Sequence, residues 1–214
     1  MNETNASEAT SARRRRRSNG ERSRAAILEA AARLATVEGL DGLSIARLAG
    51  EVGMSKSGLF AHFGSKEELQ LAAIETAEAL YEEEVVAPAL AQPTPLARLR
   101  ALCERFLSHV ERGVFPGGCF FASVAAELDT RPGPTRDRAA AMVTRWLRLL
   151  EATIREAQAE GAIDSTEDAG QLAFELNAML LQANATFLIA NRDRLPLERA
   201  RVGIDRRLAA ATTA

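Results

Sequence analysis

Residues 44–69, SIARLAGEVGMSKSGLFAHFGSKEEL, restrict the fold of this chain more than any other stretch. Ser44 and Ser55 each stand where a side-chain oxygen accepts a hydrogen bond from the free N–H groups at the start of a helix. Gly53 lies between the two segments and permits a tight turn. Ser65 begins an S-x-x-E capping box, which opens a longer helix. We therefore predict a short helix, a glycine turn, a second short helix and a long helix.

An amphipathic helix is predicted just before this segment. Apolar residues recur with the helical period over residues 24–38, and Gly39 follows where a left-handed C-terminal residue is favoured. Two short helices joined by a glycine turn and braced by an earlier helix form a helix-turn-helix. The second helix of that motif fits the DNA major groove, and its N-terminal half reads base edges. The sequence thus predicts a DNA-binding headpiece at residues 21–66.

The charge distribution favours the same interpretation. The chain carries 27 Lys and Arg against 29 Asp and Glu, a net charge of −2. Residues 1–66 hold 11 basic and 7 acidic side chains, whereas residues 67–214 hold 16 and 22. A basic N-terminal segment followed by an acidic remainder is expected of a protein that contacts the phosphates of nucleic acid with one end only.

Residues 1–20 are predicted to be a disordered basic tail. They contain no apolar run, which argues against a signal peptide, and they carry the block Arg13–Arg17. Basic N-terminal arms follow phosphates or enter the minor groove. A solvated tail that only adds non-specific affinity explains the same arginines, and the sequence leaves both interpretations open.

Residues 22–75 resemble the N-terminal domain of the TetR/AcrR family of bacterial transcriptional repressors. The glycine turn, the S-K-x-x-L-[YF]-x-[HY]-F run at 55–63 and the S-K-E-E-L run at 65–69 carry the resemblance. The resemblance implies an all-α homodimer that binds a palindromic operator in double-stranded DNA. It also implies that a small-molecule effector enters the second domain, here residues 67–214, and releases the operator.

The resemblance also assigns DNA-binding roles by position. Phe60 stands where many members have Tyr, so we expect it to press on a sugar or a thymine methyl instead of donating to a phosphate. Capping alone explains Ser44, and His62 also fits a surface ring. Only two of the basic residues are lysines, and both lie in the headpiece. The predicted DNA-binding residues are Ser44, Arg47, Lys56, Ser57, Gly58, Phe60, His62 and Lys66.

The remainder of the chain has the periodicity and composition of helices, and we find no alternating run long enough for a strand. The segment 166–191 is apolar on nearly every side, and its polar side chains argue against a membrane span. Such a helix is usually buried between two layers, so we expect the second layer to come from a partner subunit. The predicted body helices are 67–87, 96–110, 119–128, 135–160, 166–191 and 195–208.

Ligand pockets of the resembled family lie among the helices at about 96–187 of this chain. Most apolar side chains there serve equally well as core, and the only tryptophan, Trp146, is explained by either role. The candidate lining residues are Phe106, Cys119, Phe120, Val124, Met142, Trp146, Phe174 and Asn177.

Three other classes of function are compatible with parts of the sequence. A catalytic pair of His109 with Cys103 or Cys119 lacks any supporting motif, so we expect no enzyme, no cofactor and no metal site. A thiol-based redox sensor requires an accessible Cys of low pKa, and Cys103 lies near two arginines. A ligand-blind architectural DNA-binding protein driven by the arginine tail is the third class. In every case we expect a cytoplasmic protein.

Overall fold

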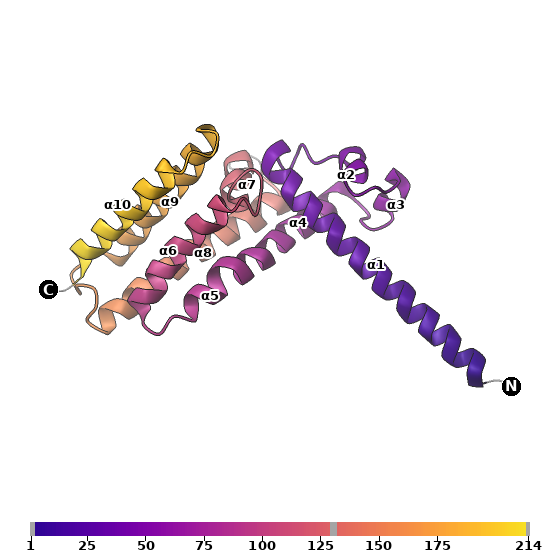
Figure 1. The fold of residues 1–214 in the computed structure, drawn as a ribbon, viewed down its shortest axis with the longest axis horizontal. Coiled ribbons are helices and arrows are strands. Elements are labelled where there is room, and N and C mark those ends of the chain that lie inside the picture. The colour runs from indigo at the N-terminus through magenta and orange to yellow at the C-terminus, as the bar shows by residue number, and fades with distance from the viewer. Residues whose placement is uncertain (1–2, 129–131, 213–214) are drawn as a thin grey trace.

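The computed structural model describes residues 3–128 and 132–212, with side chains from residue 20 onward except at Leu128 (Figure 1). These residues form helices joined by turns, and within them the only β-type pairing is an isolated bridge between Ile163 and Thr212. The prediction of an all-α fold is confirmed.

The headpiece consists of α1 (Glu3–Glu38), α2 (Ile45–Glu51) and α3 (Lys56–Phe60). α2 and α3 begin directly after Ser44 and Ser55, as expected from the caps. The helices enclose a small core of fully buried side chains. Its members include Ile27, Ala31, Leu43, Leu48, Ala49, Leu59 and Phe63.

The N-terminal segment differs from the predicted disordered tail. Residues 3–20 continue α1 as helix, and this part of α1 projects away from the rest of the molecule (Figure 1). The stretch contains no proline and no glycine before Gly20, and Ala, Glu and Arg are good helix formers. Because residues 27–38 already form a packed helix, extending it does not carry the cost of a new nucleus.

The next helix joins headpiece and body. α4 (Lys66–Tyr81) begins in the headpiece core with Leu69, Ala72 and Ala73 and ends in the body core with Ile74, Ala77 and Tyr81. We expected one helix to residue 87, but α4 is followed by a π-helical turn, η1 (Glu82–Val86), and by α5 (Ala87–Leu90). Pro88 explains the change, because a proline in a continuing α-helix lacks the N–H and its ring meets the carbonyl four residues back.

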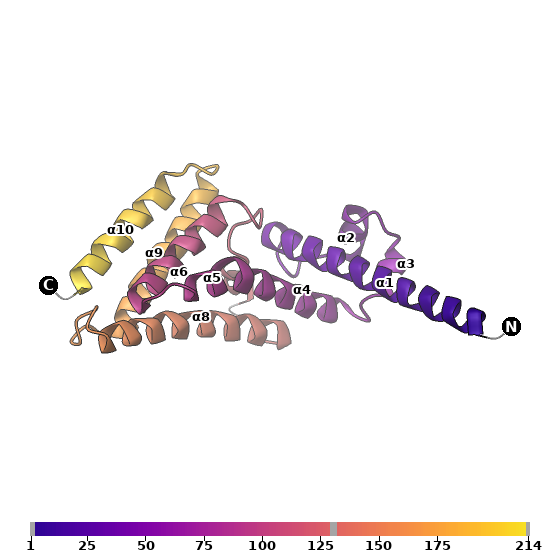
Figure 2. The same cartoon turned by 60° about the horizontal axis from the view of Figure 1, so that its bottom comes forward.

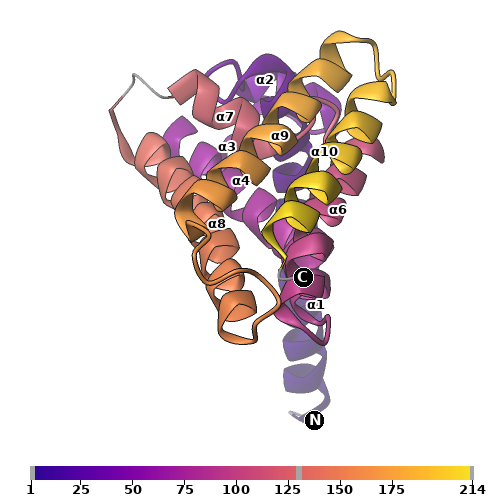
Figure 3. The ribbon, with the colours of Figure 1, turned by 90° about the vertical axis from the view of Figure 1, so that its left-hand side faces the viewer.

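The body contains α6 (Pro95–Glu111), α7 (Phe120–Leu128), α8 (Pro134–Ala159), α9 (Ala169–Ile189) and α10 (Leu195–Ala211). These bounds lie close to the predicted ones. α9 packs against α8, α6 and α10, while α8 also contacts α4, α6 and α7. Figures 2 and 3 show α8 and α10 on opposite sides of the body with α9 between them.

Of the described residues, α9 forms the one helix long and apolar enough to cross a membrane by length and composition alone. In the fold it is a core helix that packs on three neighbours. Its Glu175 forms an ion pair with Arg207 of α10, and Arg207 also pairs with Glu167 at 2.5 Å. Charged side chains along one side of a helix are costly to place within a lipid bilayer.

Candidate DNA-binding surface and ligand cavity

Three serines determine where the headpiece helices begin. The Oγ atoms of Ser44, Ser55 and Ser65 each accept a hydrogen bond from the backbone N–H three residues later, at 3.1 Å. Glu68 returns a bond from Oε2, which accepts the Gly64 N–H at 3.0 Å. The capping box is therefore present, although its return bond reaches the residue before Ser65. These caps set the start and the direction of each short helix.

The side of α3 predicted to face DNA points to solvent. Lys56 and Ser57 are exposed at the start of the helix, and Phe60 is 51% exposed at its end. Gly58 and His62 are half-buried. Leu59, on the opposite side, is fully buried in the headpiece core. A short helix that offers a lysine, a serine and a bare aromatic ring to solvent has the composition of a surface that meets base edges and sugars.

Arg47 and Lys66, two of the predicted DNA-binding cations, have protein partners in this structure. Arg47 pairs with Glu38 at 3.0 Å and with Glu51 at 3.5 Å, and the hydrogen bond and charge of Glu38, then the charge of Glu51, raise the pKa of Arg47. Lys66 donates from Nζ to the Asp41 carbonyl at 2.6 Å. Exposed pairs of this kind contribute little to stability, so exchange for a phosphate costs little.

Arg24 of α1 is a headpiece residue that the sequence did not single out. Its Nη1 donates to the His62 carbonyl at 2.8 Å, and its guanidinium lies 4.5 Å from the centre of the Phe63 ring. This contact ties α1 to the turn after α3 and combines a hydrogen bond with a cation–π interaction. The pairing joins residues 38 positions apart, so no local pattern indicates it.

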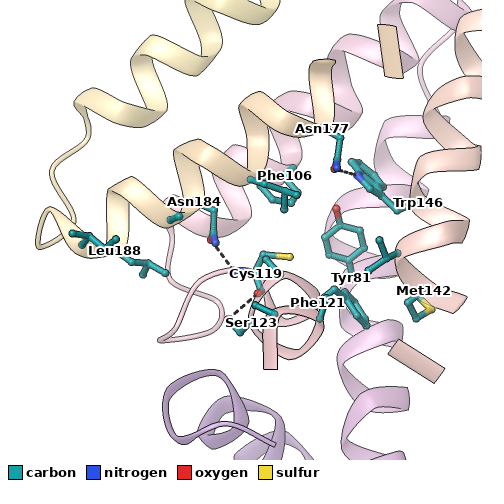
Figure 4. Close-up of a pocket in the computed structure, with 17 residues that line it drawn as sticks. Tyr81, Phe106, Cys119, Phe121, Ser123, Met142, Trp146, Asn177, Asn184 and Leu188 are labelled. Carbon is teal, nitrogen blue, oxygen red and sulfur yellow. Dashed lines mark hydrogen bonds between the residues drawn. The ribbon is translucent and has the colours of Figure 1, made fainter. Parts of the chain in front are cut away.

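The body contains a cavity of about 580 Å³ beside α7 that is partly open to solvent and is within the size range of small-molecule sites (Figure 4). α4 contributes Tyr81 and α6 contributes Phe106, while α7, α8 and α9 form the rest of the wall. The described lining residues are Tyr81, Phe106, Cys119, Phe121, Ala122, Ser123, Ala125, Ala126, Met142, Val143, Trp146, Asn177, Leu181, Asn184, Ala185, Leu188 and Ile189.

Five of the eight predicted lining residues lie in this wall, and three do not. Phe106, Cys119, Met142, Trp146 and Asn177 line the cavity. Their contact with a ligand remains a prediction.

The other three do not line this cavity, and helix phase explains why. Phe120 and Val124 lie four positions apart on the side of α7 that is buried in the core, at 1% and 0% exposure, so their neighbour Phe121 meets the cavity instead. Phe174 lies on the outer side of α9 and is 63% exposed.

Aromatic rings form one end of the cavity. Tyr81 packs edge-on against Trp146 at 5.6 Å and against Phe121 at 5.9 Å between ring centres, and Phe106 stacks on Trp146 at 6.2 Å. Burial, with smaller contributions from Cys119 and Cys103, raises the pKa of Tyr81 well above its usual value, so its phenol is neutral at pH 7. This end of the cavity offers flat apolar faces to a ligand.

The polar groups in the wall are few and uncharged. Asn177 Oδ1 accepts the Trp146 Nε1–H at 3.0 Å, and Asn184 Oδ1 accepts the Cys119 N–H at 2.9 Å (Figure 4). Each amide oxygen is engaged, which leaves the NH2 groups as donors for a ligand. Among the described lining residues there is no Asp, Glu, Lys or Arg. Since a buried charge needs a partner, the wall fits a neutral, mainly apolar molecule.

The cysteines lack the features of a redox sensor. Both are buried, and burial, helped by the charge of Glu104, raises the pKa of Cys103 to about 12. Burial also raises the pKa of Cys119. The reactive form of cysteine is the thiolate, which such environments suppress. Among the side chains that the structure describes, no group of His, Cys, Asp and Glu is arranged to hold a metal ion.

Two family models match the chain. The model described as "Bacterial regulatory proteins, tetR family" matches residues 27–73, and the one described as "Tetracyclin repressor-like, C-terminal domain" matches residues 95–204. No curated protein matches the chain significantly.

Solved structures resemble the whole chain. A TetR transcriptional regulator from Chloroflexus aurantiacus J-10-FL is 28% identical with a TM-score of 0.83, covering 91% of this chain and 98% of that one. AibR, solved with isovaleryl coenzyme A and operator DNA, is 30% identical with a TM-score of 0.64, over 76% of this chain and 86% of AibR. A TetR-family regulator from Cytophaga hutchinsonii shares the fold at 21% identity and a TM-score of 0.80, with 92% and 98% coverage.

Proposed function

Because this chain belongs to the TetR family of bacterial regulators, we propose that it is a ligand-released repressor. A homodimer binds a palindromic operator in double-stranded DNA and leaves it when a small, neutral, mainly apolar molecule occupies the body cavity. One observation carries the proposal: a single helix, α4, packs in the headpiece core at one end and lines the cavity with Tyr81 at the other. We place the protein in the cytoplasm, where it reaches the chromosome, and propose that it acts by binding without catalysis.

On the DNA side, the exposed start of α3 supports base reading. Lys56, Ser57 and Gly58 are proposed to meet base edges in the major groove, and Phe60 a sugar or a thymine methyl. Positioning on the phosphates is assigned to the remaining predicted residues, which are Ser44, Arg47, His62 and Lys66.

The outer surface of α9 and α10 supports a homodimer. Five of the eight large hydrophobic side chains that are exposed among the described residues lie there. On α9 they recur at helical spacing, so they form one continuous stripe of unburied apolar surface. A partner that presents the same stripe about a two-fold axis would cover both copies, and this symmetry is also what a palindrome requires. The five are Phe174, Leu181, Ile189, Leu195 and Val202.

The relative solved with isovaleryl coenzyme A and operator DNA supports a regulator that binds both DNA and a small molecule. The described wall of this cavity carries no basic side chain for the phosphates of a coenzyme A thioester. We therefore propose a neutral effector without phosphate.

The proposal is tested by selecting DNA from a random pool with the full-length protein. Enrichment of one palindrome, a footprint over both half-sites and a sedimenting dimer of 23.0 kDa chains are the expected results. A footprint without sequence preference and a steep dependence on salt would instead favour the architectural alternative. For the effector, Trp146 is the only tryptophan and lines the cavity, so its fluorescence reports occupancy. Neutral apolar probes should quench it more strongly than anionic ones of equal size.

A further inference from the structure

We propose that Glu127, on the last turn of α7, is the positioning residue that couples the cavity wall to the DNA-binding headpiece. The proposal rests on the proposed function. Glu127 Oε2 accepts the Leu40 N–H at 2.6 Å, and Oε1 accepts the Asp41 N–H at 2.8 Å. One carboxylate from the body thus accepts hydrogen bonds from two successive backbone N–H groups in the turn between α1 and α2. We call this pair of hydrogen bonds the Glu127 clasp.

The turn is shaped to receive a carboxylate. Gly39 has φ +80°, a left-handed conformation that lets the next two N–H groups point to one anion. A Cβ at Gly39 would lie 3.0 Å from Glu127 Oε2, so the carboxylate also needs the space that glycine leaves. Hydrogen bonds to an ionised acceptor are shorter and stronger than those between neutral groups.

The carbonyl groups of the same two residues are bound by α4. Gln70 Nε2 donates to the Leu40 carbonyl at 2.8 Å, and Lys66 Nζ donates to the Asp41 carbonyl at 2.6 Å. The α1–α2 turn is therefore held between α7 on one side and α4 on the other. A shift of α7 relative to α4 must break a bond at this turn or move the turn, and α1 and α2 with it.

α7 is also a wall of the cavity. Asn184 of α9 holds its beginning through the Cys119 N–H, and Glu127 holds its end to the headpiece. Between these two points Phe121, Ser123 and Ala125 line the cavity. α7 and α1 lie next to each other (Figure 1). A ligand that displaces α7 therefore acts on a helix whose last turn is hydrogen-bonded to the headpiece.

A second contact lies just before α7. The Gly117 N–H donates to Thr36 Oγ1 of α1 at 3.0 Å, and a Cβ at Gly117 would lie only 1.8 Å from the Thr36 carbonyl oxygen. The loop that leads into α7 thus packs directly on the α1 backbone. This contact holds the start of α7 on α1, while the Glu127 clasp holds the other end of α7 on the α1–α2 turn.

The clasp has two states because hydrogen bonds of this type are lost within about an ångström of displacement. When it is made, the position of α7 and the orientation of the headpiece are linked. When it is broken, the end of α7 can shift without moving the α1–α2 turn. Coupling between two sites requires such an element, whose equilibrium both sites bias. Without Glu127, operator affinity should depend much less on the cavity, because only α4 and the Gly117–Thr36 contact then link the two.

The first test uses hydrogen exchange and needs no effector. In the unmodified dimer, the selected operator should slow amide exchange in residues 120–128 by about fivefold or more. In Glu127→Gln the slowing of residues 120–128 should disappear while protection of α3 remains. Asp164→Asn is the matched control, because Asp164 Oδ1 also accepts a backbone N–H at 2.8 Å, but outside the cavity wall and the headpiece. Operator-dependent slowing of α7 that is equal in Glu127→Gln and the unmodified protein would overturn the proposal.

The second test uses the neutral probe N-phenyl-1-naphthylamine, with binding followed through Trp146. Saturating probe should weaken operator binding of the unmodified protein by about fivefold or more, and that of Glu127→Gln by less than about twofold. Glu127→Asp, whose carboxylate is one methylene further back, should lie between the two and replaces Glu127→Gln if that variant unfolds. Equal probe effects in all variants would contradict the clasp.

Failure of the proposed function would be recognised separately. If the unmodified protein selects no operator, the repressor proposal falls, while the clasp is still decided by exchange of the Leu40 and Asp41 amides. These two amides should exchange faster in Glu127→Gln than in Asp164→Asn, and equal rates would refute the clasp by themselves.

Discussion

His109 is predicted to make the protein sensitive to mild acid. It lies on α6 at 1% exposure, packed edge-on against Tyr81 at 5.7 Å and Phe115 at 5.6 Å between ring centres. Its Nδ1 and Nε2 have no hydrogen-bond partner among the described residues. Burial first, and the charge of Arg112 second, lower the pKa of His109 from 6.5 to about 4, against a smaller opposing effect of Glu84.

The sign and size of the effect follow from this pKa. The folded protein binds the proton more weakly than the unfolded chain, so the contribution of His109 is complete above pH 6.5. It is lost as the pH falls from 6.5 to about 4, where the total loss reaches about 3 kcal/mol. At pH 5.5 the loss is about 1.4 kcal/mol of the free energy of unfolding. Most carboxylates titrate below that pH, so they add little there.

The perturbation is His109→Phe, which keeps a ring between Tyr81 and Phe115 and removes both nitrogens. Urea unfolding at pH 8 and pH 5.5, at one fixed protein concentration, measures the difference. The unmodified protein should lose about 1.4 kcal/mol more than His109→Phe between these two pH values. His62→Gln removes the only other histidine and serves as the control, which should keep the full loss. If His109→Phe loses as much stability as the unmodified protein, the buried imidazole is not the cause.

The remaining predictions concern the interface, the headpiece and the cavity. Phe174→Arg, at a side chain 63% exposed on α9 and outside the cavity wall, should weaken dimerisation without unfolding the subunit, and a dimer of unchanged affinity in sedimentation would argue against this interface. Lys56→Ala should relax base preference by roughly 1–3 kcal/mol per lost contact, whereas Lys66→Ala should lower the salt slope by about one per half-site. If the two variants bind operator and scrambled DNA identically across a salt series, the distinction between base reading by Lys56 and phosphate contact by Lys66 is wrong. Ala122→Phe should fill the cavity and abolish quenching of Trp146 by a neutral probe while operator binding persists, and retained quenching would place the probe elsewhere.

The headpiece could be predicted from the sequence because its signals are local. Ser44, Ser55 and Ser65 cap helices within three residues of themselves, and Gly53 provides the positive φ that the turn needs. The side of α3 that faces solvent follows once the helix start is known. Helical periodicity likewise gave the body helices to within a few residues, because long amphipathic segments carry a strong signal.

The cavity wall was predicted only in part, because which side of a helix faces a cavity is decided by tertiary packing. On α7, one position separates the buried Phe120 from the lining Phe121, and no periodicity distinguishes two adjacent phenylalanines. Tyr81 was missed because its role depends on where α4 ends relative to α8. Arg24 and Glu127 were missed for a related reason, since each binds a backbone group far away in sequence.

The uncharged wall of the cavity also bears on how an effector reaches the protein. A neutral, mainly apolar molecule partitions into a bilayer, whereas transfer of an ion from water into the bilayer costs free energy. The neutral effector proposed for this wall is therefore of a kind that can enter a cell by diffusion, without a transporter. For such a compound the concentration inside the cell follows the concentration outside. A regulator of this kind would monitor the surroundings of the cell directly, and its response would be limited by membrane permeation.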